Sequence, residues 1–240
     1  MLVVSWNIRF GGGDRLDAIA EDLIRRSPDI IVLGEHTTAT TPPLLKQLGA
    51  AGWAHSAITE PPERLGGVAI LSKHDLVVRP LPPGLESFGF RYQAVGIPAL
   101  DLEVRGIYAP LKQNECRDFW ESALSALGTE SERPILVVGD INTGAGGIDS
   151  PAPKVPSEKY FHQIHERGYI DLWRQAHPTE AMEYTWVWQD KAKEKATPFR
   201  LDHAFGSPAV SERLVSCSYD HLVREAELSD HSLLSVELRA

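Results

Sequence analysis

The chain has 240 residues, of which 42% are hydrophobic and 24% are charged, and this is the composition of an ordinary globular protein. It excludes a disordered chain, and a protein of this length buries roughly three-quarters of its unfolded surface, enough to form a core without a disulfide or a structural metal. The net charge of −9 disfavours tight, unassisted binding to a polyanion, unless part of the acidic surplus binds a cation or the substrate is small.

The chain also lacks the signals of membrane insertion and secretion. No apolar segment approaches the roughly 20 residues that a membrane helix requires, so we expect no membrane partner. The N-terminal residues Met-Leu-Val-Val-Ser-Trp have no charged leader and no small-residue cleavage site, and they predict a strand instead of a signal peptide. Cys116 and Cys217 form no CxxC motif, which indicates two reduced core thiols. We therefore expect a cytoplasmic protein, and a monomer.

The start of the chain predicts a strand, a helix and a second strand. Residues 2–6 are apolar enough for a buried strand, and a polar, glycine-rich loop follows from Asn7 to Gly13. Apolar residues then recur at helical spacing between Leu16 and Ile24, and Pro28-Asp29 ends that helix. Residues 30–33 form the next buried strand. Each of the two strands is followed by a polar residue at its C-terminal end.

The rest of the chain predicts more strands than helices. Helices are expected between Pro110 and Gly128 and over residues 157–167, and a Gly- and Pro-rich loop is expected over 143–156. Strands are expected over residues 66–72, roughly 75–79, 92–97, 101–107, 135–138, 184–188, 201–205, 213–219 and 232–238. This mixture favours two packed sheets with helices outside over a single doubly wound parallel sheet, within one domain of residues 1–240.

Acidic and carboxamide side chains follow several of these buried strands. They are Asn7, Glu35, Asp140 with Asn142, and Asp230 with His231. Strand ends hold side chains rigidly beside the loops that form clefts, and carboxylates gathered there repel one another unless a cation or protons intervene. Hard oxygen ligands suit Mg²⁺ or Mn²⁺, and the thiolate or multi-histidine sets of Zn²⁺ are missing from these positions. Each residue alone has a simpler explanation as a turn former or a solvated charge, which for Asp140 alone is the favoured one, and only their combination points to a site.

The motifs in combination resemble one family. The chain is similar to the endonuclease/exonuclease/phosphatase superfamily, of exonuclease III and DNase I-like type, because the motifs of that family occur in order from residue 3 to residue 238. These are Ser5-Trp6-Asn7-Ile8-Arg9, Pro28 to Glu35, Gly106-Ile107-Tyr108-Ala109-Pro110, Val138-Gly139-Asp140-Ile141-Asn142, Tyr184-Thr185-Trp186, Arg200-Leu201-Asp202-His203 and Leu228-Ser229-Asp230-His231-Ser232.

The resemblance implies a fold, a reaction and roles for particular residues. The fold is a four-layer α/β sandwich of two mixed sheets with helices outside, and the reaction is hydrolysis of a phosphoester by in-line attack of water with Mg²⁺, or Mn²⁺, as cofactor. The resemblance also assigns a role to each matching residue: Glu35 binds the metal with Asn7 and Asp230 close by, Asp140 orients or deprotonates the water, Asn142 and Tyr108 donate to the phosphoryl group, His231 stabilises its charge, and Asp202 orients His231.

The chain departs from the family pattern at two motifs. Gly34 stands where the family commonly has Gln, and this removes a hydrogen-bond donor near Glu35. Leu111 follows Pro110 where the exonuclease III branch commonly has Asn, which weakens the case for a DNA-backbone contact at this strand.

Other candidates are less specific. The His162-x-x-His165 spacing is that of a helix face, which we expect to be solvated and not metal-binding. Trp173, Trp186 and Trp188 could stack on bases, although a strand tryptophan such as Trp186 more commonly belongs to a core. The charged segment Lys191–Lys195 is equally consistent with a phosphate-attracting loop and with a solubilising one.

Three functions are compatible with the sequence. The first is a nuclease that acts on DNA, which the Tyr108 and Thr185-Trp186 motifs favour. The second is a phosphodiesterase or phosphatase that acts on a small phosphorylated metabolite or a lipid headgroup, which the acidic surface favours. The third is a non-catalytic binding module on the same fold, which the presence of the complete catalytic set disfavours.

Overall fold

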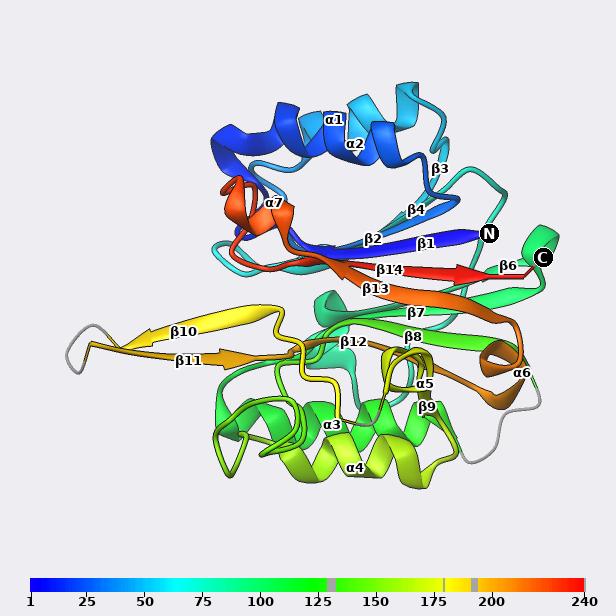
Figure 1. The fold of residues 1–240 in the computed structure, drawn as a ribbon. Helices are drawn as coiled ribbons and strands as arrows, with labels where there is room; N and C mark the ends of the chain where they lie inside the picture. The colour runs from blue at the N-terminus through cyan, green and yellow to red at the C-terminus, as the bar shows by residue number, and fades with distance from the viewer. Residues whose placement is uncertain (129–132, 179, 191–193, 240) are drawn as a thin grey trace.

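The computed structural model describes residues 1–128, 133–178, 180–190 and 194–239 of the chain. Two six-stranded sheets pack face to face, and helices lie against the outer face of each sheet, so that the molecule has four layers (Figure 1). Both sheets are mixed, because each contains one parallel pair among antiparallel neighbours. The fold is therefore the four-layer α/β sandwich that the sequence predicts.

The first sheet holds the first and the last strand of the chain side by side. Its order is β13-β14-β1-β2-β4-β3, and only β1 and β2 are parallel. A parallel pair needs a crossover, which α1 (Leu16–Arg26) supplies, and α1 and α2 (Pro42–Ala50) cover the outer face over a core that includes Trp6, Leu23 and Leu44. The strands are β1 (Leu2–Asn7), β2 (Ile30–His36), β3 (His55–Ile58), β4 (Gly67–Ser72), β13 (Leu214–Asp220) and β14 (Leu233–Leu238).

The second sheet repeats this plan on the other side of the molecule. Its order is β5-β6-β7-β8-β12-β9, and β7 and β8 are its parallel pair. The crossover between them is α3 (Gln113–Leu127), which lies with α4 (Glu158–Glu166) on the outer face over Phe119, Trp120 and Ile164. The strands are β5 (Val77–Val78), β6 (Tyr92–Ile97), β7 (Leu102–Tyr108), β8 (Ile135–Asp140), β9 (Ile170–Asp171) and β12 (Asp202–Gly206).

The central layer of the core is made of short, branched side chains from both sheets. Val32 and Val68 of the first sheet belong to the same buried cluster as Val104 and Val138 of the second. The two sheets approach closely at Gly106, where a Cβ atom would lie 2.7 Å from Cγ1 of Val68 and 3.0 Å from Cγ1 of Val32. β-Branched residues suit such a surface because their side chains are stiff and cover the strand.

One hairpin lies outside both sheets. β10 (Trp186–Asp190) and β11 (Lys195–Phe199) form a separate antiparallel ribbon that projects beyond the sandwich (Figure 1). The remaining short elements are α5 (Leu172–Ala176), α6 (Pro208–Ser211), α7 (Leu222–Glu225) and the 3₁₀ turns η1 (Gly13–Arg15), η2 (Glu86–Arg91) and η3 (Pro98–Leu100).

Sequence periodicity predicts α1, α3 and α4 and most of the strands, with ends that shift by a few residues. It does not predict α2, which begins at Pro42-Pro43; proline fits the first turn of a helix, where no amide donor is needed. It also misses β3 and β9, which have only four and two residues, and β11. Both cysteines are buried free thiols, as predicted, and no helix in the described part of the chain is long and apolar enough to cross a membrane.

Candidate active site

The strand register gathers the predicted residues at one edge of the sandwich. Asn7 ends β1 beside Gly34 of β2, so Asn7 and Glu35 meet in the first sheet. In the second sheet Asp140 is paired with Tyr108 on one side and with Asp202 on the other. The C-terminal ends of both parallel pairs therefore lie at the same edge, and the Asn7 side-chain amide joins the two sheets by donating 3.0 Å bonds to Glu35 Oε1 and to Asp140 Oδ2.

The backbone around Asp140 requires a glycine. Gly139 has a φ of 143°, and a Cβ atom there would lie 2.0 Å from the Ile107 carbonyl oxygen on β7. Any other residue would push β7 and β8 apart, so Gly139 allows Asp140 to sit beside Tyr108. Beyond it, Asn142 adopts a left-handed backbone with φ of 51° and donates its own amide to Asp140 Oδ1 at 3.0 Å. The Asn142 side chain also donates to the Ala109 carbonyl oxygen at 2.7 Å, which leaves its second N–H for another acceptor.

Glu35 lies at a β-bulge and is held by three donors. The pairing between β2 and β4 shifts at this residue, whose φ is 58°, and a side chain at Gly66 would place its Cβ 2.7 Å from the Glu35 Cα. One carboxylate oxygen accepts from Asn7 and from the Tyr108 hydroxyl at 3.0 Å, and the other accepts from the Phe10 amide at 2.9 Å. These bonds fix Glu35 without the glutamine that the family commonly has at position 34. Burial, together with Glu35, raises the pKa of Tyr108 far above its ordinary range, so the hydroxyl stays a donor.

Asp140, Asp202 and His231 form a buried cluster, in which one ligand atom from each residue lies within 4.8 Å of the others. His231 Nδ1 bonds Asp202 Oδ2 at 2.8 Å, and His231 Nε2 lies 3.9 Å from Asp140 Oδ2. Burial alone would lower the pKa of His231, but the Asp202 and Asp140 carboxylates raise it to about 10. Burial raises the pKa of Asp140 to about 7 against the opposing influence of His231. The cluster thus pairs an imidazolium with a carboxyl group that titrates near neutrality.

Residues without a predicted role hold this cluster in place. Thr185 Oγ1 accepts from the amide of Asp202 at 3.2 Å, and Tyr219 donates its hydroxyl to the Asp202 carbonyl oxygen at 2.6 Å. Ser229 Oγ donates to the Asn7 carbonyl oxygen at 2.6 Å and accepts from the amide of His231 at 3.2 Å. Thr185 and Ser229 belong to the motifs quoted above, whereas nothing in the sequence pattern marks Tyr219.

Arg200 forms a second buried network behind the cluster. Its side chain is fully buried and donates to Asp149 Oδ1 at 2.8 Å and to Asp171 Oδ2 at 2.6 Å. Burial would raise the pKa values of both carboxyl groups, yet Arg200 keeps them below their ordinary range. Asp149 lies in the 143–156 loop, and Arg200 lies two residues before Asp202. The network therefore connects the loop that follows Asn142 to β12, the strand that carries Asp202.

Asp230 lies at the rim of the site. Its side chain is 43% exposed, accepts from Trp186 Nε1 at 3.3 Å and lies 3.9 Å from Arg9 Nε. The Trp186 ring lies 6.1 Å from the ring of His231, so this tryptophan borders the site although we expected it in the core. Trp173 is buried, and Trp188 is 46% exposed on β10.

The donor set fits a divalent cation. Asp140 and Asp202 flank the His231 imidazolium, and the Asn7 amide links Asp140 to a third carboxylate, that of Glu35. Such a surplus of partly desolvated negative charge is unfavourable without a cation, and oxygen donors are those that Mg²⁺ and Mn²⁺ prefer. His231 already bonds Asp202 and carries a proton, so it is a poor ligand.

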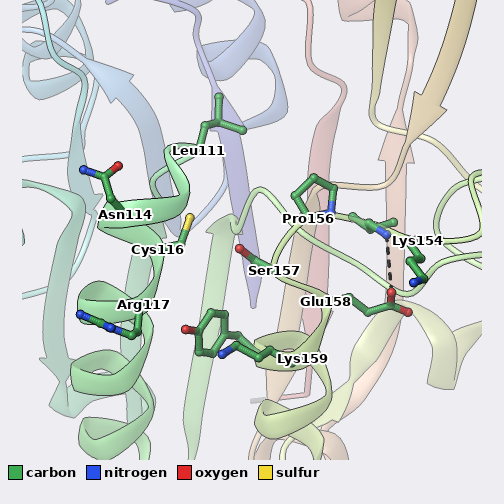
Figure 2. Close-up of a pocket in the computed structure, with 11 residues that line it drawn as sticks. Leu111, Asn114, Cys116, Arg117, Lys154, Pro156, Ser157, Glu158 and Lys159 are labelled. Atoms are coloured by element: carbon green, nitrogen blue, oxygen red, sulfur yellow. Dashed lines mark hydrogen bonds between the residues drawn. The ribbon is translucent and has the colours of Figure 1, made fainter.

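A cavity of about 1060 Å³ is lined by residues that follow Tyr108 and Asn142 along the chain. Its walls are the two segments that leave the site, namely the start of α3 after Leu111 and the end of the loop that leads into α4 (Figure 2). Thr143 Oγ1 fastens that loop by donating to the Pro156 carbonyl oxygen at 2.7 Å. The lining carries three basic side chains and one acidic one, which are Arg117, Lys154, Lys159 and Glu158.

The acidic member of this lining is held by backbone amides and stays charged, because these bonds lower the pKa of Glu158. Glu158 Oε1 accepts from the Gly146 amide at 2.8 Å, and its other oxygen accepts from the Val155 amide at 3.5 Å. Three basic side chains against one acidic side chain leave the lining with more positive than negative charge. In a protein whose net charge is −9, this is a local surplus of positive charge.

Two further sequence candidates are the His162-x-x-His165 pair and the Lys191–Lys195 segment. His162 is on α4 with its ring nitrogen 3.5 Å from Glu158, and His165 contacts the rings of Phe161 and Phe205, so both belong to a helix face. Of the Lys191–Lys195 segment, residues 191–193 lie outside the described part of the chain, and Lys195 begins β11.

Comparison with known proteins identifies relatives over the whole chain. The model of the Endonuclease/Exonuclease/phosphatase family matches residues 4–231. The chain is 27% identical to the DNA repair nuclease APEX1 of Danio rerio, across 99% of this chain and 82% of that protein. Its fold is similar to that of an AP endonuclease from Archaeoglobus fulgidus, with a TM-score of 0.85 and 21% identity. It is also similar to the structure of the 3′ phosphatase NExo from Neisseria bound to product DNA hairpin, with a TM-score of 0.81 and 24% identity. Both alignments cover 100% of this chain and 100% of the other chain.

Proposed function

Because the chain belongs to the endonuclease/exonuclease/phosphatase family, whose members are phosphoester hydrolases, we propose that it is a divalent-metal-dependent phosphodiesterase that cleaves DNA by in-line attack of water. The observation that carries this proposal is the buried Asp140–His231–Asp202 cluster beside Glu35, which combines a proton acceptor, a cation and a candidate metal ligand at one sheet edge. The site draws Glu35 from one sheet and Asp140 from the other, which supports one catalytic domain over residues 1–240.

Asp140 takes the proton of the attacking water in this proposal. Its pKa of about 7 lets it hold that proton at neutral pH, and the Asn142 amide and Asn7 fix the orientation of its carboxylate. A general base is most effective when its pKa lies near the pH at which the enzyme works. Asn142 retains one N–H to donate to a phosphoryl oxygen.

His231 supplies the positive charge that the phosphoryl group needs as its negative charge grows. Asp202 fixes the imidazole through the 2.8 Å bond to Nδ1 and keeps it cationic, so that the Nε2–H is left to donate to the substrate. Tyr108 holds Glu35 through its hydroxyl and lies at the same edge, where it can also border the phosphate. No Ser or Cys nucleophile is needed, because water attacks directly.

Glu35, with Asn7 and Asp230 near it, is the proposed site of Mg²⁺ or Mn²⁺. The ion would neutralise charge on the phosphoryl oxygens and acidify the attacking water. Glu35 is suited to this because its position is fixed by three donors while Oε2, which accepts only one of them, keeps a lone pair for a further partner.

A nucleic acid substrate is favoured by the cavity with the basic lining. Arg117, Lys154 and Lys159 line it, and basic side chains of this kind attract the phosphates of a nucleic acid strand. This local positive surplus offsets the repulsion that the net charge of −9 creates. It also compensates for Leu111, which offers no polar contact at the end of β7.

The test is hydrolysis of a small panel in Mg²⁺ and in chelator. The panel holds supercoiled plasmid, a duplex with one abasic site, single-stranded DNA, bis(p-nitrophenyl) phosphate and p-nitrophenyl phosphate. We expect metal-dependent nicking of the DNA substrates, and its loss by orders of magnitude in Asp140→Asn, a variant that removes the proton acceptor without changing shape. Cleavage of the small esters alone would instead indicate a metabolite phosphodiesterase or phosphatase, and full activity in Asp140→Asn would contradict the site.

A further inference from the structure

The loop between β1 and η1 carries an exposed aromatic residue beside the proposed metal ligand. Phe10 lies three residues beyond Asn7, the last residue of β1, and it is 66% exposed. Its amide donates to Glu35 Oε2 at 2.9 Å, so its backbone is in direct contact with the site. The proposed reaction uses only this amide and gives no role to the phenyl ring.

The backbone of this loop is left-handed over five consecutive residues. From Arg9 to Gly13 the φ values are 53°, 48°, 69°, 83° and 53°. The last three residues are glycines, which adopt this conformation readily, whereas a bulky residue such as Phe10 adopts it against a steric cost. Strained residues of this kind persist where the surrounding structure fixes them, and they gather at functional sites.

Contacts from two sides fix the strained loop. Arg15 Nη2 donates to the Arg9 carbonyl oxygen at 2.8 Å. On the other side, the Gly11 amide donates to the Glu35 carbonyl oxygen at 2.7 Å, and Thr40 Oγ1 donates to the Gly11 carbonyl oxygen at 3.2 Å. A Cβ atom at Gly11 would lie 2.2 Å from Thr40 Oγ1, so the loop packs closely on the segment that follows β2. The backbone that carries the exposed ring is therefore held in place.

We propose that Phe10 is a specificity-determining residue, whose phenyl ring stacks on the nucleobase next to the scissile phosphate. The inference deepens the proposed function and rests on it, because it names the part of the DNA substrate that this side of the site binds. A DNA strand offers one kind of planar, apolar group, the nucleobase, and every base has a π-face that an aromatic side chain can cover. Stacking also needs no positive charge, which suits a chain with a net charge of −9.

The experiment measures binding of ligands with and without a base by isothermal titration calorimetry. The 5′- and the 3′-monophosphate of 2′-deoxyadenosine, and 2-deoxyribose 5-phosphate, are each titrated with Mg²⁺ into the full chain carrying Asp140→Asn, which prevents hydrolysis. In this background Phe10→Ala removes the ring but keeps the amide that bonds Glu35, and Phe10→Tyr keeps an aromatic ring. Leu222→Ala is the matched control, because Leu222 is an apolar residue of α7 with a similar exposure of 67%.

With Phe10 in place, we expect at least one of the two nucleotides to bind about tenfold or more tighter than the sugar phosphate. Phe10→Ala should abolish this difference and leave the affinity for the sugar phosphate unchanged, whereas Phe10→Tyr and Leu222→Ala should keep the difference. An equal loss for nucleotides and sugar phosphate in Phe10→Ala would show that the residue acts only through Glu35. That result, a preference for the base that survives in Phe10→Ala, or no preference with Phe10 in place would overturn the proposal.

The failure of this inference and the failure of the proposed function give different results. Cleavage of DNA by the wild type, together with binding that does not depend on the base, would reject the role of Phe10 and leave the proposed nuclease in place. Binding that depends on the base through Phe10, without cleavage of any DNA substrate, would reject the nuclease and retain a nucleotide-binding site.

Discussion

Replacement of Arg200 tests how the network behind the site supports the fold. Arg200→Met keeps the length and the apolar part of the side chain but removes the charge that faces Asp149 and Asp171. Asp149 keeps Arg174 at 2.8 Å, whereas Asp171 loses both of its guanidinium bonds and is left with the amide of Arg174 and with His203, whose Nδ1 lies 3.7 Å away. Breaking a buried pair in this way costs about 3–5 kcal/mol of unfolding free energy at pH 7.

The pH dependence of this loss has a definite sign. In the wild type the pKa values of Asp149 and Asp171 lie below their ordinary range, so their stabilising contribution is complete above about pH 4 and is lost as the pH falls through the folded-state values. In Arg200→Met burial raises the pKa of Asp171 above its value in the unfolded chain, so the penalty is largest at pH 7 and is relieved on acidification. The difference between the two proteins therefore shrinks from pH 7 toward pH 4.

Urea denaturation followed by circular dichroism at pH 7 and pH 5 measures this difference, and a thermal scan should show a decrease of roughly 6–20 °C in Tm at pH 7. Arg200→Lys is the control, because it restores a charge without the paired geometry and should recover part of the loss. A loss below about 1 kcal/mol at pH 7, or a gap that widens with acid, would refute the electrostatic reasoning.

Three further predictions concern the site. Gly139→Ala places a Cβ against the Ile107 carbonyl oxygen, and we expect a loss of about 1–3 kcal/mol in unfolding free energy together with most of the turnover; a fully active variant of wild-type stability would contradict the assigned backbone role. Tyr108→Phe removes the 3.0 Å bond to Glu35 and should raise the Mg²⁺ concentration for half-maximal activity about 10- to 100-fold, which a metal titration of activity measures; an unchanged midpoint argues against Glu35 as the metal residue. In the double variant Lys154→Gln/Arg117→Gln, the slope of log KM for DNA against log salt concentration should decrease by about 1.5 units, while turnover of a small ester stays constant. An unaltered slope would show that the cavity does not bind the DNA substrate.

The sequence explains only in part why the site suits a divalent metal. Acidic residues at strand ends indicate a cation site. The structure adds that Glu35 and Asp140 share a single Asn7 amide and that Asp202 bonds His231, so the carboxylates have few other donors. The same geometry explains how Gly34 is tolerated, since the amide of Phe10 and the hydroxyl of Tyr108 donate to Glu35 instead. Neither contact follows from spacing along the chain.

The amino-acid sequence by itself determines the main elements and the family of this protein. Apolar periodicity is a local property, so it predicts α1, α3, α4 and most strands, and the ordered motifs around Asn7, Glu35, Asp140 and His231 indicate the family that the comparisons support. Short elements such as β3 and β9 carry too few residues for a periodic signal and form only because neighbouring strands offer them partners.

The tertiary structure alone decides which distant residues touch. The register of β8 between β7 and β12 sets Asp140 beside Tyr108 and Asp202, and Tyr219 and Arg200 acquire their roles only from that packing. The loop that carries Phe10 is likewise held by Arg15 and Thr40, which lie outside every motif. The physical reason is that hydrogen bonds and charges act over a few ångströms in space, whereas the sequence records only the order of residues along the chain.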